Sequence, residues 1–157
     1  MKRALAVLLL VGTAHADKPK PKPKLKLTSE LTPLPPNKAC KVTDDKLQCP
    51  GRGDYTVTIG KADSGSYIRV QKGELVVDLP DGKLGRQLEW RMADGVPFAV
   101  IATVTDSDGA HLVVRGLEGY GAIGGRIDAK EKRAGKKAQQ LADEGFANAK
   151  SLPDKKP

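Results

Sequence analysis

Short apolar runs separated by turn residues dominate the chain from Tyr55 onward and constrain its fold more than any other feature. Candidate strands span residues 55–59, 67–71, 74–79, 87–92, 98–105 and 111–115, with a weaker seventh at 123–127. The connectors, such as Asp94-Gly95, contain glycine, which supplies the positive φ that tight turns require. Connections this short suit hairpins and leave no room for the helices that join parallel strands. The pattern predicts an antiparallel β-sheet meander of about six to seven strands.

One helix is predicted at the C-terminal end. Asp128 and Glu131 have the spacing of a capping box, and a stripe of small and apolar side chains follows at helical period. The stripe consists of Ala134, Ala138, Leu141, Ala142, Gly145, Phe146 and Ala149. Small residues let a helix approach a sheet closely, so the fold class is α+β, with one C-terminal α-helix packed on the sheet.

Residues 1–16 have the parts of a secretory signal peptide. Lys2 and Arg3 give a positive start, residues 4–11 are apolar, and residues 14–16 offer small side chains for cleavage before Asp17. The apolar run is shorter than a membrane-spanning helix, and no later stretch reaches that length. We therefore expect an exported protein of the periplasm or the extracellular space, with no transmembrane segment.

Residues 17–37 alternate lysine with proline and then carry a second proline cluster. Proline fixes φ and like charges repel, so this segment is predicted to be an extended linker ahead of one globular domain at residues 38–150. A disordered tail is expected at residues 151–157. The linker is either a solvated spacer or a contact to an anionic envelope polymer or lipid head groups. The lysines available for that contact are Lys18, Lys20, Lys22, Lys24 and Lys26.

The positive charge of the chain lies mostly outside the predicted domain core. The formal net charge is +8, yet residues 38–128 carry 12 basic and 13 acidic side chains, a net charge of −1. A nearly neutral domain on an exported chain argues against nucleic acid as a partner. The predicted helix has basic residues opposite its apolar stripe, which form either a solvated face or a second anionic contact. These are Lys132, Arg133, Lys136 and Lys137.

The two cysteines predict a disulfide bond between Cys40 and Cys49, because export leads to an oxidising compartment. With both cysteines paired, His111 is the one histidine after residue 16, so no metal site is expected.

Gly119, Gly121 and Gly124 match the spacing of a dinucleotide-binding loop, but no βαβ pattern surrounds them. We interpret them as a turn and expect no cofactor.

Four charged residues are candidate contacts for a partner. Arg52 and Asp54 flank Gly53 in a loop after the second cysteine; the tripeptide is either an adhesion-type motif or a simple turn. Glu89 and Arg91 flank Trp90, and strand alternation places Trp90 in the core and the charged pair outward.

Two alternative functions follow from other residues. Ser64-Gly65-Ser66-Tyr67 resembles a loop of small periplasmic lysozyme inhibitors, although the tyrosine comes one residue early, and a turn followed by a core-facing Tyr67 is the preferred interpretation. The carboxylates Glu74, Asp78 and Glu89 suggest a small hydrolase, but the sequence does not bring them together.

Three segments of the chain, taken together, resemble a family of small uncharacterised exported bacterial proteins. They are Glu89-Trp90-Arg91, the run from Gly95 to Ile101, and Ile127-Asp128-Ala129 leading to residues 141–143. The resemblance covers residues 40–146 and implies a disulfide-bearing β-rich domain without an assigned activity. We therefore expect a non-catalytic exported binding module of the bacterial cell envelope, with the hydrolase inhibitor and the hydrolase as alternatives.

Overall fold

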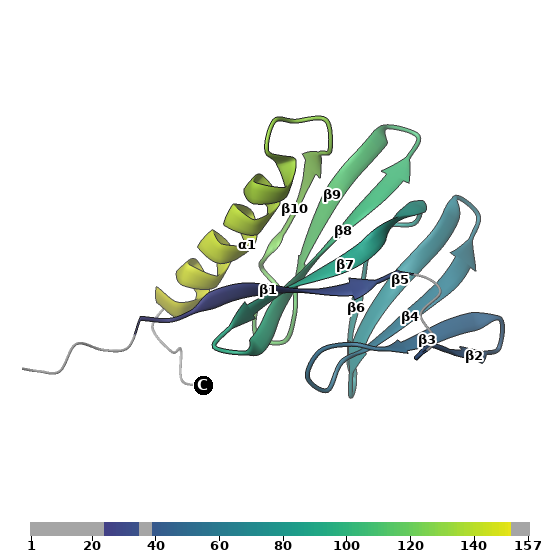
Figure 1. Ribbon diagram of the computed structural model, residues 1–157, viewed down its shortest axis with the longest axis horizontal. Coiled ribbons are helices and arrows are strands. Elements are labelled where there is room, and N and C mark those ends of the chain that lie inside the picture. The colour runs from purple at the N-terminus through teal and green to yellow at the C-terminus, as the bar shows by residue number, and fades with distance from the viewer. Residues whose placement is uncertain (1–23, 35–38, 152–157) are drawn as a thin grey trace, which may run out of the picture.

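The computed structural model describes residues 24–34 and 39–151, which form two antiparallel five-stranded sheets and one helix (Figure 1). Sheet A has the strand order β1-β7-β8-β9-β10, and sheet B has the order β2-β3-β4-β5-β6. The elements are β1 (Leu27–Pro33), β2 (Lys41–Thr43), β3 (Lys46–Pro50), β4 (Thr56–Ala62), β5 (Gly65–Lys72), β6 (Leu75–Asp78), β7 (Lys83–Ala93), β8 (Val96–Asp106), β9 (Gly109–Gly116), β10 (Gly124–Asp128) and α1 (Ala134–Ser151).

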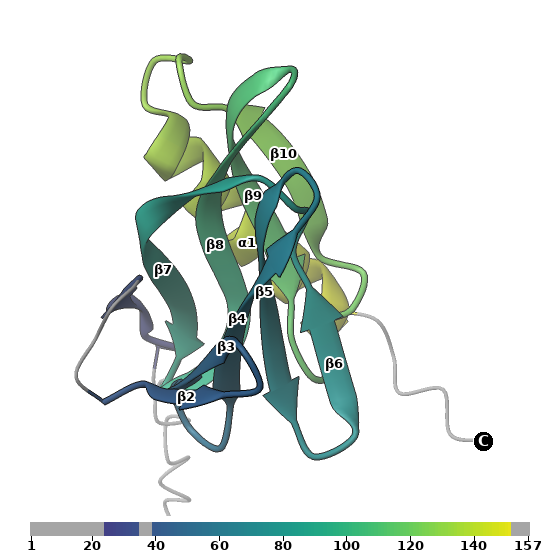
Figure 2. The ribbon, with the colours of Figure 1, turned by 90° about the vertical axis from the view of Figure 1, so that its right-hand side faces the viewer.

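Helix α1, sheet A and sheet B form three layers with sheet A in the middle (Figure 1 and, viewed from the side of sheet B, Figure 2). One apolar cluster lies between the sheets and includes Trp90 and Ile68, both fully buried. A second cluster lies between sheet A and α1 and includes Phe98, Ile101 and Phe146. Each face of sheet A therefore has its own core.

The middle position of sheet A explains the unbroken apolar run in β8. Residues 97–102 are all buried, because alternate side chains point to alternate faces and both faces are covered. Val100 contributes to the cluster between the sheets, and Ile101 contributes to the cluster under α1. Continuous burial of this kind is typical of strands covered on both sides.

The α+β class and antiparallel pairing are confirmed, but the prediction of a single meander is wrong. The seven predicted strands are present as β4–β10 and are divided between two sheets. The chain changes sheet between β6 and β7, where Leu79 is 3% exposed and Pro80 has no amide to continue the ladder. A single bridge between Ser66 and Gly82 is the last link to sheet B before β7 begins.

Residues 27–34 were expected in an extended linker and instead belong to the domain, so the linker prediction is wrong there. Strand β1 pairs with β7 from Leu27 opposite Ala93 to Pro33 opposite Gln87. Edge strands tolerate proline, because one side of their ladder needs no donor. The predicted signal peptide, Lys18, Lys20, Lys22 and residues 152–157 of the predicted tail lie outside the described residues, whereas Ser151 ends α1.

The hairpin of β2 and β3 was missed because its turn contains no glycine. Asp44 and Asp45 both adopt positive φ, 47° and 60°, a conformation that aspartate tolerates better than most residues. The disulfide between Cys40 and Cys49 links the open end of this hairpin, with the two sulfur atoms 2.00 Å apart, as predicted. The bond therefore holds an edge of sheet B.

Helix α1 begins at Ala134, later than the predicted cap at Asp128. The Asp128 carboxylate accepts a hydrogen bond from the Lys130 amide at 2.8 Å, so it closes the turn that follows β10. The predicted apolar stripe is confirmed by the burial of Ala134, Ala138, Ala142 and Phe146. No helix in residues 24–34 and 39–151 is both long and apolar enough to span a membrane.

Candidate functional site

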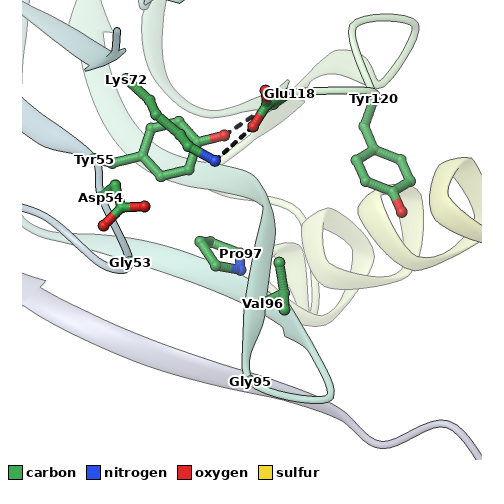
Figure 3. Close-up of a pocket in the computed structure, with 9 residues that line it drawn as sticks. All are labelled: Gly53, Asp54, Tyr55, Lys72, Gly95, Val96, Pro97, Glu118 and Tyr120. Atoms are coloured by element: carbon green, nitrogen blue, oxygen red, sulfur yellow. Dashed lines mark hydrogen bonds and ion pairs between the residues drawn. The ribbon is translucent and has the colours of Figure 1, made fainter.

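A pocket of about 220 Å³ opens where three connecting segments meet. The segments are the loop before β4, the β7–β8 turn and the β9–β10 loop. We call it the hairpin-end pocket; it is lined by Gly53, Asp54, Tyr55, Lys72, Gly95, Val96, Pro97, Glu118 and Tyr120 (Figure 3). Sheet B and sheet A both contribute to it, so the fold of the whole domain assembles the pocket.

One wall of the pocket is formed by three residues that contact one another through hydrogen bonds and an ion pair. The Lys72 ammonium lies 2.6 Å from the Glu118 carboxylate, and the Tyr55 hydroxyl accepts a hydrogen bond from the Glu118 amide at 3.2 Å (Figure 3). The ammonium is also 5.6 Å from the centre of the Tyr55 ring. The hydrogen bond to Glu118 is the main reason that the pKa of Lys72 is raised. This group fixes the β9–β10 loop to sheet B.

An exposed apolar side chain stands at the opposite side of the pocket. Asp94 and Gly95 have φ values of 48° and 82° and close the tight β7–β8 turn. Val96 follows this turn and is 65% exposed, whereas the next residue, Pro97, is buried. Figure 3 shows Val96 and Pro97 between the Tyr55 group on one side and Tyr120 on the other.

A second hollow of about 250 Å³ adjoins the first and shares Val96 and Tyr120 with it. We call it the helix-end hollow; its lining is Leu25, Ala93, Asp94, Val96, Phe98, Tyr120, Phe146 and Lys150. The Tyr120 and Phe146 rings stack with their centres 5.1 Å apart, and Phe98 lies 4.6 Å from Phe146. Leu25, at the rim, is 49% exposed. Two adjoining hollows thus flank an exposed valine.

The structure separates the two charges of the Arg52-Gly53-Asp54 tripeptide. Arg52 contacts β1. Its guanidinium lies 2.8 Å from the Glu30 carboxylate and donates a hydrogen bond to the Leu31 carbonyl at 3.1 Å. Asp54 is exposed and lines the hairpin-end pocket. Of the two predicted contacts, Asp54 therefore belongs to the pocket and Arg52 supports the loop that carries it.

The expectation that Glu89 and Arg91 point into solvent is wrong, although Trp90 is fully buried as predicted. Helix α1 covers the face of β7 on which they lie. Arg91 is 6% exposed and its guanidinium contacts both carboxylate oxygens of Asp143 at 2.7 Å. Glu89 accepts a hydrogen bond from Gln139 at 2.7 Å. Both charges hold α1 on sheet A.

Tyr67 also lies elsewhere than predicted. Ile68 is the core residue of this part of β5, with no exposure, and Tyr67 points to the outer face of sheet B. Ser64 belongs to the exposed β4–β5 turn. The loop that suggested a lysozyme inhibitor is therefore a hairpin turn, and its tyrosine lies on the outer face of sheet B.

The predicted basic contacts lie in two places. Lys24 and Lys26 are exposed, and the Lys26 backbone bonds to Asp94 beside the helix-end hollow. Lys132 and Arg133 lie in the turn before α1, and Lys136 and Lys137 lie in its first turn; all four are exposed, with Lys137 paired to Glu131. The basic residues predicted at the start of the helix therefore form an exposed surface.

The three carboxylates proposed for a hydrolase do not share one place. Glu74 lies in the β5–β6 turn, Asp78 pairs with Arg69 on sheet B, and Glu89 lies under α1. Among the described residues, no group of three histidine, cysteine, aspartate or glutamate side chains is placed to hold a metal ion.

Leu25, Val96 and Tyr120 form much of the apolar lining and were not predicted from the sequence. A tyrosine between Gly119 and Gly121 was the available signal, because an aromatic side chain in a glycine-rich loop needs a surface to cover. Comparisons with protein-family models, with curated proteins and with solved structures found no match.

Proposed function

We propose that the protein is a non-catalytic binding module, exported to the bacterial cell envelope, that holds a protein partner at the hairpin-end pocket and the helix-end hollow. The observation that carries this proposal is Val96, which is 65% exposed between two hollows of about 220 and 250 Å³. Apolar surface at the rim of concave sites is typical of interaction sites.

The chemistry of the two hollows suits a polypeptide with apolar side chains between polar ones. Val96, Leu25 and Tyr120 supply apolar contact, and the buried Phe98 and Phe146 rings lie beneath them. Asp54 in the hairpin-end pocket and Lys150 in the helix-end hollow are both exposed and form no ion pair within the described residues, so both charges are available to a partner. Lys72 and Glu118 already neutralise each other. A mixed lining of this kind resembles the apolar centre and polar rim of protein interfaces.

The charged segments outside the pocket add a weaker, salt-dependent attraction to the envelope. Lys24, Lys26 and the basic residues before and within the first turn of α1 are exposed. Exposed charges act over about 8 Å at physiological ionic strength, so they increase the local concentration of the module without defining its partner. Salt therefore distinguishes this attraction from docking at the pocket.

The test is co-sedimentation of the purified protein with isolated envelope from the organism that makes it. Val96→Asp places a charge between the two hollows and is expected to weaken binding at physiological salt at least tenfold. Val42→Asp is the matched control, because Val42 is 76% exposed on β2, away from the pocket. Protease treatment of the envelope should remove the binding that depends on Val96.

Equal binding of the Val96→Asp and Val42→Asp variants would contradict the proposal. Loss of muramidase activity on addition of the protein would instead favour the inhibitor alternative. Hydrolysis of an envelope component by the wild-type protein, abolished by a single carboxylate substitution, would favour the hydrolase.

A further inference from the structure

The outer face of sheet B carries an ordered set of polar side chains that the proposed protein contact does not use. Strand register places Gln48 opposite Thr58, Thr58 opposite Arg69, and Arg69 opposite Asp78. These four residues come from β3, β4, β5 and β6 and form one row across the sheet. With strands about 4.8 Å apart, the row extends about 14 Å. We call this row, together with Lys46 and Tyr67, the Tyr67 face.

Tyr67 lies against the sheet because its cross-strand partner is glycine. Gly60 pairs with Tyr67, and a Cβ atom at residue 60 would lie 2.4 Å from two carbons of the tyrosine ring. Strand side chains ordinarily stand away from the sheet, and only a missing side chain lets a ring fold down onto the backbone. An aromatic ring over a cross-strand glycine also stabilises the sheet. A Tyr67→Phe substitution would keep this contact, whereas Tyr67→Ala would remove it.

Two shallow hollows lie beside this ring. One, of about 230 Å³, includes Gln48 and Thr58; the other, of about 210 Å³, includes Asp78 and Asp81. Tyr67 and Arg69 line both. The two hollows therefore adjoin at Tyr67 and Arg69.

The side chains of this face suit a ligand that both donates and accepts hydrogen bonds. Glutamine and threonine do both through one side chain. The Arg69 guanidinium is fixed by hydrogen bonds to Asp78 at 2.7 and 3.0 Å, and the two side chains remain 45% and 52% exposed. Both keep unused donors and lone pairs at defined positions. Sugar hydroxyl groups match this mixture of donors and acceptors.

Charge argues against an anionic ligand here. Lys46 and Arg69 are opposed by Asp44, Asp78 and Asp81 across the two hollows, so basic and acidic groups nearly balance. The negative face of a tyrosine ring attracts the positively polarised C–H groups on the face of a pyranose ring. An uncharged polyol with apolar ring faces fits both properties.

We propose that the Tyr67 face binds an uncharged stretch of polysaccharide, with Tyr67 stacked on one sugar ring and Gln48, Thr58, Arg69 and Asp78 bound to hydroxyl groups on either side. The site lies on the face of sheet B that points away from sheet A, separate from the hairpin-end pocket. The inference does not depend on the protein contact, and a module with both surfaces would link a protein to a polysaccharide.

The test uses isothermal titration of the purified protein with chitohexaose and with cellohexaose, and sedimentation with protease-treated peptidoglycan. At least one of these probes is expected to bind. Tyr67→Ala should weaken that binding at least tenfold, whereas Tyr67→Phe, which keeps the ring over Gly60, should weaken it less. Gln48→Ala, an exposed position with no part in the ring contact, should weaken it several-fold without lowering the melting temperature.

Leu31→Ala is the control, because Leu31 is 46% exposed on β1 at the edge of sheet A. Binding of chitohexaose and peptidoglycan would identify a cell-wall glycan as the ligand, and binding of cellohexaose alone would identify a neutral glucan. Absence of binding to all three probes would overturn the proposal, as would binding that Tyr67→Ala and Gln48→Ala leave unchanged. Protease treatment removes the partner of the hairpin-end pocket, so the two proposals fail separately.

Discussion

Two arginine–aspartate pairs with nearly the same local geometry lie in opposite surroundings. On sheet A, Arg91 contacts both oxygens of Asp143 under α1, and the two side chains are 8% and 29% exposed. On sheet B, Arg69 contacts both oxygens of Asp78 in solvent, at 45% and 52% exposure. Both arginines lie on the face of their sheet that points away from the core between the two sheets. The difference lies in what covers the sheet: the first pair holds two layers together, and the second remains free for a ligand.

The largest expected effect on stability comes from removing an aromatic side chain of α1 that covers sheet A. Phe146 is 4% exposed against Phe98, so Phe146→Ala leaves a cavity and should lower the free energy of unfolding by about 3–5 kcal/mol. Tyr67→Ala on the uncovered face of sheet B should cost about 1 kcal/mol or less. Urea denaturation measures both free energies of unfolding. Similar losses for the two variants would contradict the claim that sheet A is covered on this face and sheet B is not.

Reduction of the Cys40–Cys49 disulfide tests whether sheet B has an edge that opens on its own. The bond closes a short loop, so its loss should lower the free energy of unfolding by about 2–3 kcal/mol. Since β2 and β3 form the edge of sheet B, their amides should exchange faster after reduction. Amides of β7 and β8 should stay protected. Uniform loss of protection in both sheets would show that the edge does not open independently.

The smallest predicted effect concerns the β8–β9 turn of sheet A. The Asp108 amide donates to Asp106 at 2.9 Å, and Arg126 from β10 lies 2.8 Å away, so the pKa of Asp106 is lowered, chiefly by the amide. An acid with a lowered folded pKa stabilises the fold above its unfolded pKa of about 3.9 and loses that contribution as the pH falls through the folded value.

Melting temperatures between pH 6 and pH 2 would measure this contribution. The wild-type protein should lose slightly more stability below about pH 4 than Asp106→Asn, which has no proton to gain at that position. Parallel curves for the two proteins would show that the Asp106 contacts do not contribute.

The sequence predicted the strands with glycine turns and the helix, because alternation and helical period are local properties. It failed where a strand is ordered by a distant partner and where a turn contains no glycine. Strand β1 lies in a proline-containing segment and gains its order from pairing with β7, about 60 positions away in the chain. The β2–β3 turn uses Asp44 and Asp45 in place of glycine. The run from Pro97 to Ala102 did carry the signal of a strand covered on both faces.

The candidate sites were harder to predict. Alternation indicates which face of the sheet a side chain is on, but not whether another element covers that face. Glu89 and Arg91 were assigned to the surface, but α1 covers them, so that Arg91 is buried and Glu89 is half-buried. Tyr67 was assigned to the core, but Ile68 is the core residue and Tyr67 lies on the outer face, over Gly60. Val96 and Tyr120 come together only when two loops meet. Such residues are recognised from the tertiary arrangement alone.

The most direct test of the central claim compares Asp143→Ala with Asp78→Ala in urea denaturation. The first leaves the nearly buried Arg91 without its carboxylate partner and should lower the free energy of unfolding by about 3 kcal/mol or more. The second breaks an exposed pair and should change it by about 1 kcal/mol or less. Losses of equal size would contradict the account. They would mean that coverage by α1 does not determine how much each arginine–aspartate pair contributes to the free energy of unfolding.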